Sequence, residues 1–287
     1  MRFTFIIILL FVYSNMAFSQ EKKEKGDIDA KYECTYSIKF VNDTTKMSTG
    51  REDWFILKIG DDLTYGYSYL DFYRDSLLTT PGGAKIFAES FLRDVENGSI
   101  TKSSDFYSIV LMGTKLYKDY EENKLKVLDN VSVHWFIYEE ELIPQNWMIA
   151  EDTMTIAGYV CQKAICEYRG RSYEAWFTPA ISISEGPWKF YGLPGLIMKL
   201  YDIKHHYDFE LIGIKKIEEK IDVKVLSAKK MNRFTSPKLT EIARKDFLLM
   251  KLGEKGNLIS KMDLSRVGLS TEPIQMKYGY IELDLFQ

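Results

Sequence analysis

The chain has 287 residues, of which 46% are hydrophobic and 28% charged, and its formal net charge at pH 7 is -3. This composition excludes a disordered chain, which combines few apolar residues with a high net charge. The nearly neutral balance argues against a nucleic-acid partner, because binding to phosphates needs a basic face. The length fits one large β domain or two smaller ones.

The N-terminus has the pattern of a secretory signal peptide. A positive start and a short apolar run are followed by the small residues Ala17 and Ser19, where a signal peptidase reads. The apolar run is shorter than the roughly 20 residues that cross a bilayer as a helix. We therefore expect a signal peptide over 1–19, cleaved before Gln20, and a single β-rich domain over 20–287. This predicts a periplasmic or secreted protein with no transmembrane segment after cleavage.

Alternation of apolar and polar residues predicts the first strands. Residues 31–41 alternate cleanly and place Cys34 on the inward face. Strands are also predicted over 53–59 and 63–73, the latter carrying a ladder of tyrosines. Ordinary sheet packing explains such a ladder, with a ligand platform as the alternative. After a Pro-Gly-Gly break, apolar residues at helical spacing predict a helix over 84–96.

The rest of the chain continues the strand pattern. Further strands are predicted over 105–112, 114–120, 124–138, 147–156, 159–168, 171–178, 196–201 and 207–217. A second helix is predicted over 236–252, with Ser236 as its N-cap and Pro237 at its first position, and residues 277–286 are a candidate edge strand. Some ten short strands with few helices indicate a mainly β fold: a curved, largely antiparallel sheet or half-barrel with about two helices.

Three cysteines remain after signal cleavage, and export makes a disulfide permissible. Cys161 and Cys166 lie on one predicted strand, about 16 Å apart, whereas a bridge tolerates under about 7 Å. A bridge from Cys34 to one of them is therefore favoured. Because Cys166 shares its strand face with other small or apolar residues, the prediction is a Cys34–Cys166 disulfide with Cys161 free.

Sequence motifs of familiar chemistry are absent. There is no nucleophile elbow, no zinc-binding His-Glu-x-x-His, no phosphate loop and no dinucleotide fingerprint. His205 and His206 stand beside Asp208 at a predicted hairpin tip, where neighbouring side chains of a strand point to opposite faces. A solvated polar turn is the simpler interpretation, and a metal site is the alternative. We predict no cofactor and no metal.

The most unusual stretch lies between two predicted strands, at residues 186–197. Its defining positions are Gly186, Pro187, Gly192, Leu193, Pro194, Gly195, Leu196 and Ile197. Pro194 and Gly195 suit the centre of a type II turn, because proline fixes the first φ and glycine supplies a positive second one. We predict a rigid corner. Trp176, Trp188 and Phe190 are candidates to border a ligand-binding face beside it, and ordinary core aromatics are the simpler alternative.

Over about 157–203 the chain resembles the GLPGLI family of exported Bacteroidota proteins. The resemblance rests on the run that starts at Gly158-Tyr159, on Arg169-Gly170-Arg171, on Ala175–Pro179 and on the whole of 186–197. One position departs, since members often carry proline where Ser182 stands here. The resemblance implies a cell-envelope location, often near TonB-dependent outer-membrane transport systems, and it brings no established catalytic residue.

Two hypotheses for the function follow. The first is a non-enzymatic binding, carrier or transport-accessory protein of the envelope, whose partner is an apolar small molecule or a TonB-dependent outer-membrane transport system. The alternative is an exported hydrolase or metal-binding protein with an unrecognised site near His205, His206 and Asp208.

Overall fold

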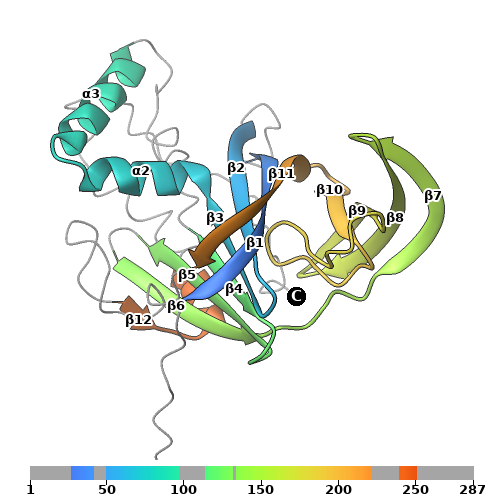
Figure 1. Ribbon diagram of the computed structural model, residues 1–287. Coiled ribbons are helices and arrows are strands. Elements are labelled where there is room, and N and C mark those ends of the chain that lie inside the picture. Colours follow the sequence, from blue (N-terminus) through green and yellow to red (C-terminus); the bar gives the residue numbers. More distant parts are fainter. Residues whose placement is uncertain (1–26, 42–49, 97–113, 132–133, 222–238, 251–287) are drawn as a thin grey trace, which may run out of the picture.

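The computed structural model describes residues 27–41, 50–96, 114–131, 134–221 and 239–250 (Figure 1). These residues form one open, strongly curved sheet of 12 strands, accompanied by helices. The mainly β, largely antiparallel fold expected from the sequence is confirmed: every strand pair is antiparallel except β12 with β6. No helix within the described ranges is both long and apolar enough to cross a membrane.

The strands are β1 (Ile28–Val41), β2 (Gly50–Ile59), β3 (Leu63–Ser68), β4 (Lys115–Asp119), β5 (Lys124–Val131), β6 (His134–Glu141), β7 (Met148–Ile156), β8 (Tyr159–Tyr168), β9 (Arg171–Thr178), β10 (Leu196–Asp202), β11 (Tyr207–Ile221) and β12 (Leu239–Glu241). Their order across the sheet is β12-β6-β5-β4-β3-β2-β1-β11-β10-β9-β8-β7. The first and last thirds of the chain therefore meet at the β1–β11 pair.

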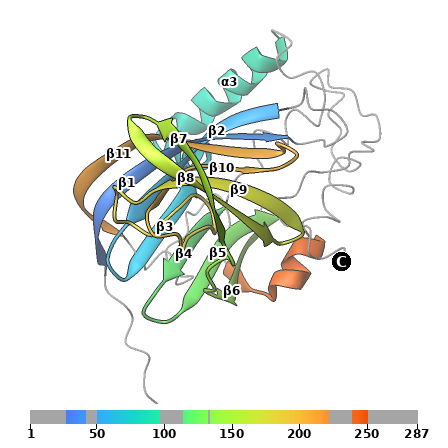
Figure 2. The ribbon, with the colours of Figure 1, turned by 90° about the vertical axis from the view of Figure 1, so that its right-hand side faces the viewer.

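Strand β1 lies near the middle of the sheet and shows why the sheet bends. Alternate side chains on it are buried, as the sequence predicted for Cys34, Tyr36 and Ile38. Its pairing with β11 shifts register twice, between Ala30 and Tyr32 and again at Thr35/Tyr36. Such irregularities bend a strand and increase its twist. The sheet consequently curls, and the two views in Figures 1 and 2 show its strands turning around a common interior.

The hairpins of β7, β8 and β9 follow the predicted pattern closely. The two turns are Ala157-Gly158 and Arg169-Gly170, and all four residues have positive φ, between 50° and 82°. Two-residue turns of this kind match the right-handed twist of the strands they join. The bounds predicted for β8 and β9 are accordingly those of the structure.

One predicted strand is partly a helix. The tyrosine-rich stretch 63–73 pairs as β3 only up to Ser68, and α2 (Tyr69–Thr79) begins immediately after it. Ser68 caps this helix, since its side chain accepts a hydrogen bond from the N–H of Asp71 at 3.2 Å. A serine cap satisfies an N–H that the first turn leaves open, and this local signal outweighs the β preference of tyrosine. The predicted helix that follows is confirmed as α3 (Gly83–Glu96).

Two other predictions are corrected. The single strand expected over 124–138 is two antiparallel strands, β5 and β6, in which Val131 pairs with His134. Within the helix expected over 236–252, residues 239–241 form β12 and the described helix covers only 244–250. The leader over 1–19, the strand over 105–112, the cap Ser236 with Pro237, and the tail over 277–286 lie outside the described residues.

Candidate binding site

Residues 186–197, called the motif segment below, link β9 to β10 and are folded into the interior. Glu185 and Tyr191 form an isolated antiparallel bridge, so the chain doubles back on itself. The loop is closed further by backbone hydrogen bonds from Phe190 N to Pro187 O at 3.1 Å and from Ile197 N to Glu185 O at 3.0 Å. The segment is therefore a fixed insert whose apolar side chains belong to the core.

Gly195 is a position that only glycine fits. Its φ is +149°, and a Cβ built there would lie 2.1 Å from the carbonyl oxygen of Thr178. The N–H of Gly195 donates to Leu193 O at 2.8 Å, which closes a three-residue turn over Pro194. The positive φ agrees with the prediction, but the hydrogen bond spans two residues and not the three of a type II turn.

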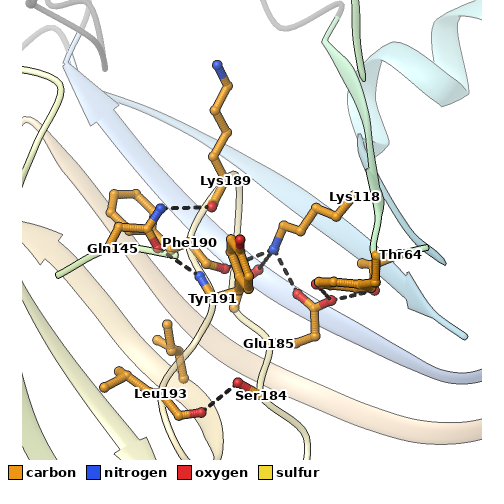
Figure 3. A network of polar contacts seen from close by, with 12 residues as sticks. Thr64, Lys118, Gln145, Ser184, Glu185, Lys189, Phe190, Tyr191 and Leu193 are labelled. Atoms are coloured by element: carbon orange, nitrogen blue, oxygen red, sulfur yellow. Dashed lines mark hydrogen bonds and ion pairs between the residues drawn. The ribbon is translucent and has the colours of Figure 1, made fainter. Parts of the chain in front are cut away.

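The start of the segment is held by what we call the inner lysine pair, Lys118 and Glu185. Lys118 on β4 donates to Glu185 Oε2 at 2.7 Å and to the carbonyl oxygens of Gly186 (3.2 Å) and Phe190 (2.9 Å). Its side chain is fully buried, and that of Glu185 is 5% exposed. Burial lowers the pKa of Lys118, against the opposing effect of Glu185. Figure 3 shows the ammonium inserted among these acceptors.

The second oxygen of Glu185 completes the network. It accepts hydrogen bonds from the hydroxyls of Thr64 and Tyr120. Burial, followed by the charge of Glu185, raises the pKa of Tyr120 well above its ordinary value, so the phenol stays protonated as a donor. A buried carboxylate is tolerated when a cation and several donors surround it. The arrangement anchors the segment to β3 and β4.

Farther along the segment lies the outer lysine pair, Lys189 and Glu140. Lys189 donates to Glu140 Oε1 at 2.6 Å, and Glu140 Oε2 also pairs with Arg169 and, at 3.3 Å, with Arg244. Burial opposes the charge on Arg169, but the Glu140 carboxylate and the Tyr168 phenol together raise the pKa of that guanidinium. The pair ties the segment to β6 on one side and to the β8–β9 turn on the other.

A loop between β6 and β7 fastens the other side of the segment. Gln145 donates to Lys189 O at 3.2 Å and accepts from Tyr191 N at 3.0 Å. The indole N–H of Trp147 donates to Tyr191 O at 2.9 Å. In Figure 3, the Gln145 amide faces the backbone of the segment while the Lys189 side chain points away from the inner pair. Backbone groups without partners of their own are thus satisfied by side chains of this loop.

A cleft of about 510 Å³ opens where these parts meet. It is lined by residues 141–146, residues 167–170, Lys189 and Tyr191 of the motif segment, and Leu125. The volume lies within the roughly 300–1,000 Å³ of small-molecule sites. Its lining residues include acidic, amide, tyrosine and basic residues beside aliphatic ones, so the cleft suits a ligand with several polar groups.

The aromatic residues predicted to border a ligand face are not placed together. Phe190 is fully buried and packs on Tyr173 with ring centroids 4.6 Å apart, and Trp188 is buried beside Phe55. Trp176 is half-buried and its indole N–H donates to Glu174 at 3.1 Å, away from the cleft. Trp188 and Phe190 are therefore core residues.

The paired histidines have separate partners. His205 Nδ1 lies 2.9 Å from Asp208 on the surface, whereas His206 Nδ1 lies 3.0 Å from Arg171, which binds Asp202. Burial lowers the pKa of His206; Asp202 opposes this and Arg171 adds to it, which fits a neutral ring beside a guanidinium. Across the described residues, no three His, Cys, Asp or Glu side chains gather as a metal site requires.

The predicted Cys34–Cys166 disulfide is not formed. All three cysteines are buried free thiols. Cys34 lies on β1 and Cys166 on β8, with β11, β10 and β9 between them in the sheet. The two cysteines therefore do not lie on neighbouring strands, whose spacing of about 4.8 Å fits the Cα separation of under about 7 Å that a bridge needs. Cys34 does face the core, as predicted, and burial raises its pKa to about 12.

Comparisons with known proteins match a stretch that contains the motif segment, and they assign no activity. A family described as a protein of unknown function (Porph_ging) matches residues 166–199. No curated protein matches the sequence. Solved structures of PNGF-II in the C2 and P21 space groups are similar, at 16% identity and with TM-scores of 0.47 and 0.46. They cover 78% of this chain, which spans about a third of their length (33% and 34%).

The residues that build the site were missed by reading the sequence. Lys118, Glu185, Lys189 and Glu140 are charged, and such residues are almost never fully buried unless they are paired. One signal was available for Lys118: it stands between Leu116 and Tyr120 with the same strand parity as both. An inward-facing lysine on a strand implies a buried acidic partner, although it does not say which one.

Proposed function

We propose that this protein is a non-enzymatic binding protein of the cell envelope that holds a small polar ligand in the cleft beside the motif segment. One observation carries the proposal: the most distinctive stretch of the sequence forms a wall of the cleft through Lys189 and Tyr191. The segment is fixed there by the inner and outer lysine pairs. A wall held this firmly suits a preformed site, which loses little entropy when a ligand binds.

The lining favours a polar ligand over the apolar one that the sequence suggested. Glu141, Asn146 and Glu167 offer acceptors and an amide around the opening, while Tyr168 and Tyr191 offer aromatic rings with hydroxyls. Rings that stack and short polar side chains that hydrogen-bond together suit a hydroxyl-rich molecule such as a saccharide. We therefore assign the cleft to a small, hydroxyl-rich compound.

The envelope setting rests on the leader-like N-terminus and on the resemblance to exported proteins. Association with a TonB-dependent outer-membrane transport system belongs to the same proposal, in which the protein presents or retains a ligand for transport. The hydrolase alternative gains no support from His205 and His206, because their ring nitrogens face different partners.

The test combines ligand discovery with a variant that blocks the cleft. The full chain, exported and purified without denaturation, is studied by native mass spectrometry for bound molecules and by calorimetry against mono- and disaccharides. Asn146→Trp places a large ring at the exposed edge of the cleft and should weaken binding roughly tenfold or more. Lys204→Trp, on the exposed β10–β11 turn, is the control and should bind as the parent does.

Three results would contradict the proposal. The first is that no molecule co-purifies and no saccharide binds. The second is that Asn146→Trp leaves the affinity unchanged, which places the ligand elsewhere. The third is that a bound compound is converted to product, which makes the protein an enzyme.

A further inference from the structure

The two ends of the sheet are built differently. At one end, β12 has three residues and pairs in parallel with β6, and the adjoining helix packs Phe247 against Phe136 and Tyr138. At the other end, β7 has nine residues and pairs with β8 on one side, in two runs that are separated by a register shift between Ile149 and Thr153. No strand within the described residues pairs with its other side. In Figure 1, the β7–β8 hairpin arches away from the rest of the sheet.

Among the residues that the structure describes, nothing covers the outer edge of strand β7, and side chains are exposed on both of its faces. Consecutive side chains of a strand point to opposite faces. Met148 and Ile149 are consecutive, and they are 64% and 49% exposed. Met154 and, on β8, Val160 are also exposed large hydrophobic residues. A long edge with apolar side chains and unpaired backbone groups is a template for another strand, which natural proteins usually shield.

The charges on this edge select its partner. Glu151 and Asp152 are adjacent and exposed at the middle of β7, which contains no lysine, arginine or proline. Both residues lie where the β7–β8 register shifts, and two copies that paired β7 with β7 about this centre would bring Glu151 and Asp152 of one copy close to those of the other. Like charges directly opposite each other destabilise a strand pair. The same acids favour a strand that carries lysine or arginine.

We propose that β7 is a docking strand that accepts an extended, basic segment of a partner protein as an additional antiparallel strand. Backbone hydrogen bonds along the edge supply affinity, and side chains of alternating character supply selectivity. The apolar residues of the incoming segment cover Met148 or Ile149, according to the face they reach, and its cations meet Glu151 or Asp152 on the other face. This inference is independent of the cleft and its ligand.

The test uses a nine-residue peptide of alternating lysine and valine with the full chain. We expect it to bind and to slow amide hydrogen exchange within β7. The affinity of a glutamate–valine peptide should be lower by roughly tenfold or more. A lysine–valine peptide that is N-methylated at alternate residues has lost the N–H groups that would donate to the edge of β7. It should therefore not bind. Asp152→Lys should weaken the lysine peptide roughly tenfold, and Glu218→Lys, an exposed acid on β11, should leave it unchanged.

Each contrary result has a definite meaning. If the N-methylated peptide binds equally well, the attraction is charge alone and no strand is added. If the β7 amides are already protected in the monomer, the chain itself covers the edge. If protection appears with rising protein concentration, together with a dimer in sedimentation, the occupant is a second copy. Any of these overturns the proposal, and Asn146→Trp, which blocks the cleft, should not alter peptide binding.

Discussion

The two lysine pairs at the motif segment have the same chemistry, but the sheet supplies the lysine in one pair and the glutamate in the other. In the inner pair, the sheet supplies the lysine (Lys118) and the connection supplies the glutamate (Glu185). In the outer pair, the segment supplies Lys189 and the sheet supplies Glu140. Both lysine side chains are fully buried. The difference lies in what surrounds each carboxylate.

Because of that difference, the inner pair serves only to anchor the motif segment, whereas the outer pair also borders the cleft. Glu185 is surrounded by one ammonium and two neutral hydroxyl donors, all in the interior. Glu140 is surrounded by Lys189 and two guanidinium groups, one of which, Arg169, lies on the wall of the cleft. Loss of one cation leaves the first carboxylate buried without a charge partner and leaves the second still paired. Similar contacts therefore imply unequal energetic consequences.

The largest effect is expected for Lys118→Met. Methionine fills the space but leaves the Glu185 carboxylate buried without its cation, and two carbonyl oxygens of the segment lose their donor. Removing one partner of a buried pair costs about 3–5 kcal/mol. Urea unfolding followed by tryptophan fluorescence measures it. A loss below about 1 kcal/mol would show that the pair does not anchor the segment.

A double variant separates the lost cation from lost packing. In Lys118→Met with Glu185→Gln, the amide oxygen still accepts from Thr64 and Tyr120 but carries no charge. About half of the lost stability should return, because the uncompensated buried charge has been removed. If the double variant is as unstable as the single one, methionine fits the site poorly and charge is not the cause.

The next effect concerns the end of the segment, at Gly195→Ala. A Cβ there meets the Thr178 carbonyl, and the φ of +149° is unfavourable for any side chain. We expect a loss of about 2–3 kcal/mol. Gly158→Ala is the matched control, since its φ is +82° but no atom lies within 4 Å of the new Cβ. It should cost about 1 kcal/mol. Equal losses in thermal unfolding would mean that the close approach to Thr178 is unimportant.

Lys189→Met should cost less than Lys118→Met. Glu140 keeps its contacts with Arg169 and Arg244, so the carboxylate is not left without positive charge. We expect a loss of about 1.5–3 kcal/mol, because the charged hydrogen bond to Glu140 and the longer one to Tyr138 are removed. Both variants introduce methionine for a fully buried lysine, which makes their ratio informative. A loss at Lys189 as large as that at Lys118 would remove the distinction between the two pairs.

The parts of the fold that local chemistry decides were predictable from the sequence. Strands β8 and β9 were located to the residue because Ala157-Gly158 and Arg169-Gly170 mark tight turns between runs of alternating residues. Helix α2 was missed because its tyrosine, leucine and phenylalanine residues also suit a strand. The cue was Ser68, whose capping hydrogen bond to the Asp71 N–H is local, although it is visible only once the strand is known to end there.

The site was not predictable, because its contacts are distant in sequence and contrary to residue preference. Lys118 is 67 residues from Glu185, and Lys189 is 49 residues from Glu140. Nothing local indicates which lysine turns inward or which acid meets it. The motif segment was predicted to be a rigid corner, but its aromatic residues were easier to notice than Lys189, which contributes to the cleft wall.

The smallest effect is a pH dependence reported by Cys34, which lies close enough to the inner pair to sense Glu185. Burial first, and then Glu185 and Glu33, raise the pKa of this thiol to about 12. An unfolded cysteine ionises near about 8.5. Between these values the folded state binds more protons than the unfolded state, so the free energy of unfolding falls as pH rises. The stability due to Cys34 is nearly complete below about pH 7.5 and has decreased by about 0.8 kcal/mol at pH 9.

Cys34→Ala removes the contribution of this thiol to the pH dependence of the free energy of unfolding. The difference in that free energy between parent and variant should therefore narrow from pH 7 to pH 9. The parent thiol should also react with iodoacetamide only after unfolding, and all three cysteines should then be alkylated without reductant. Rapid labelling of the folded protein at Cys34 would show that the interior around the inner pair is open to solvent. The inner lysine pair would then be open to solvent, as we assign only to the outer lysine pair beside the cleft. The contrast between the two pairs would be lost.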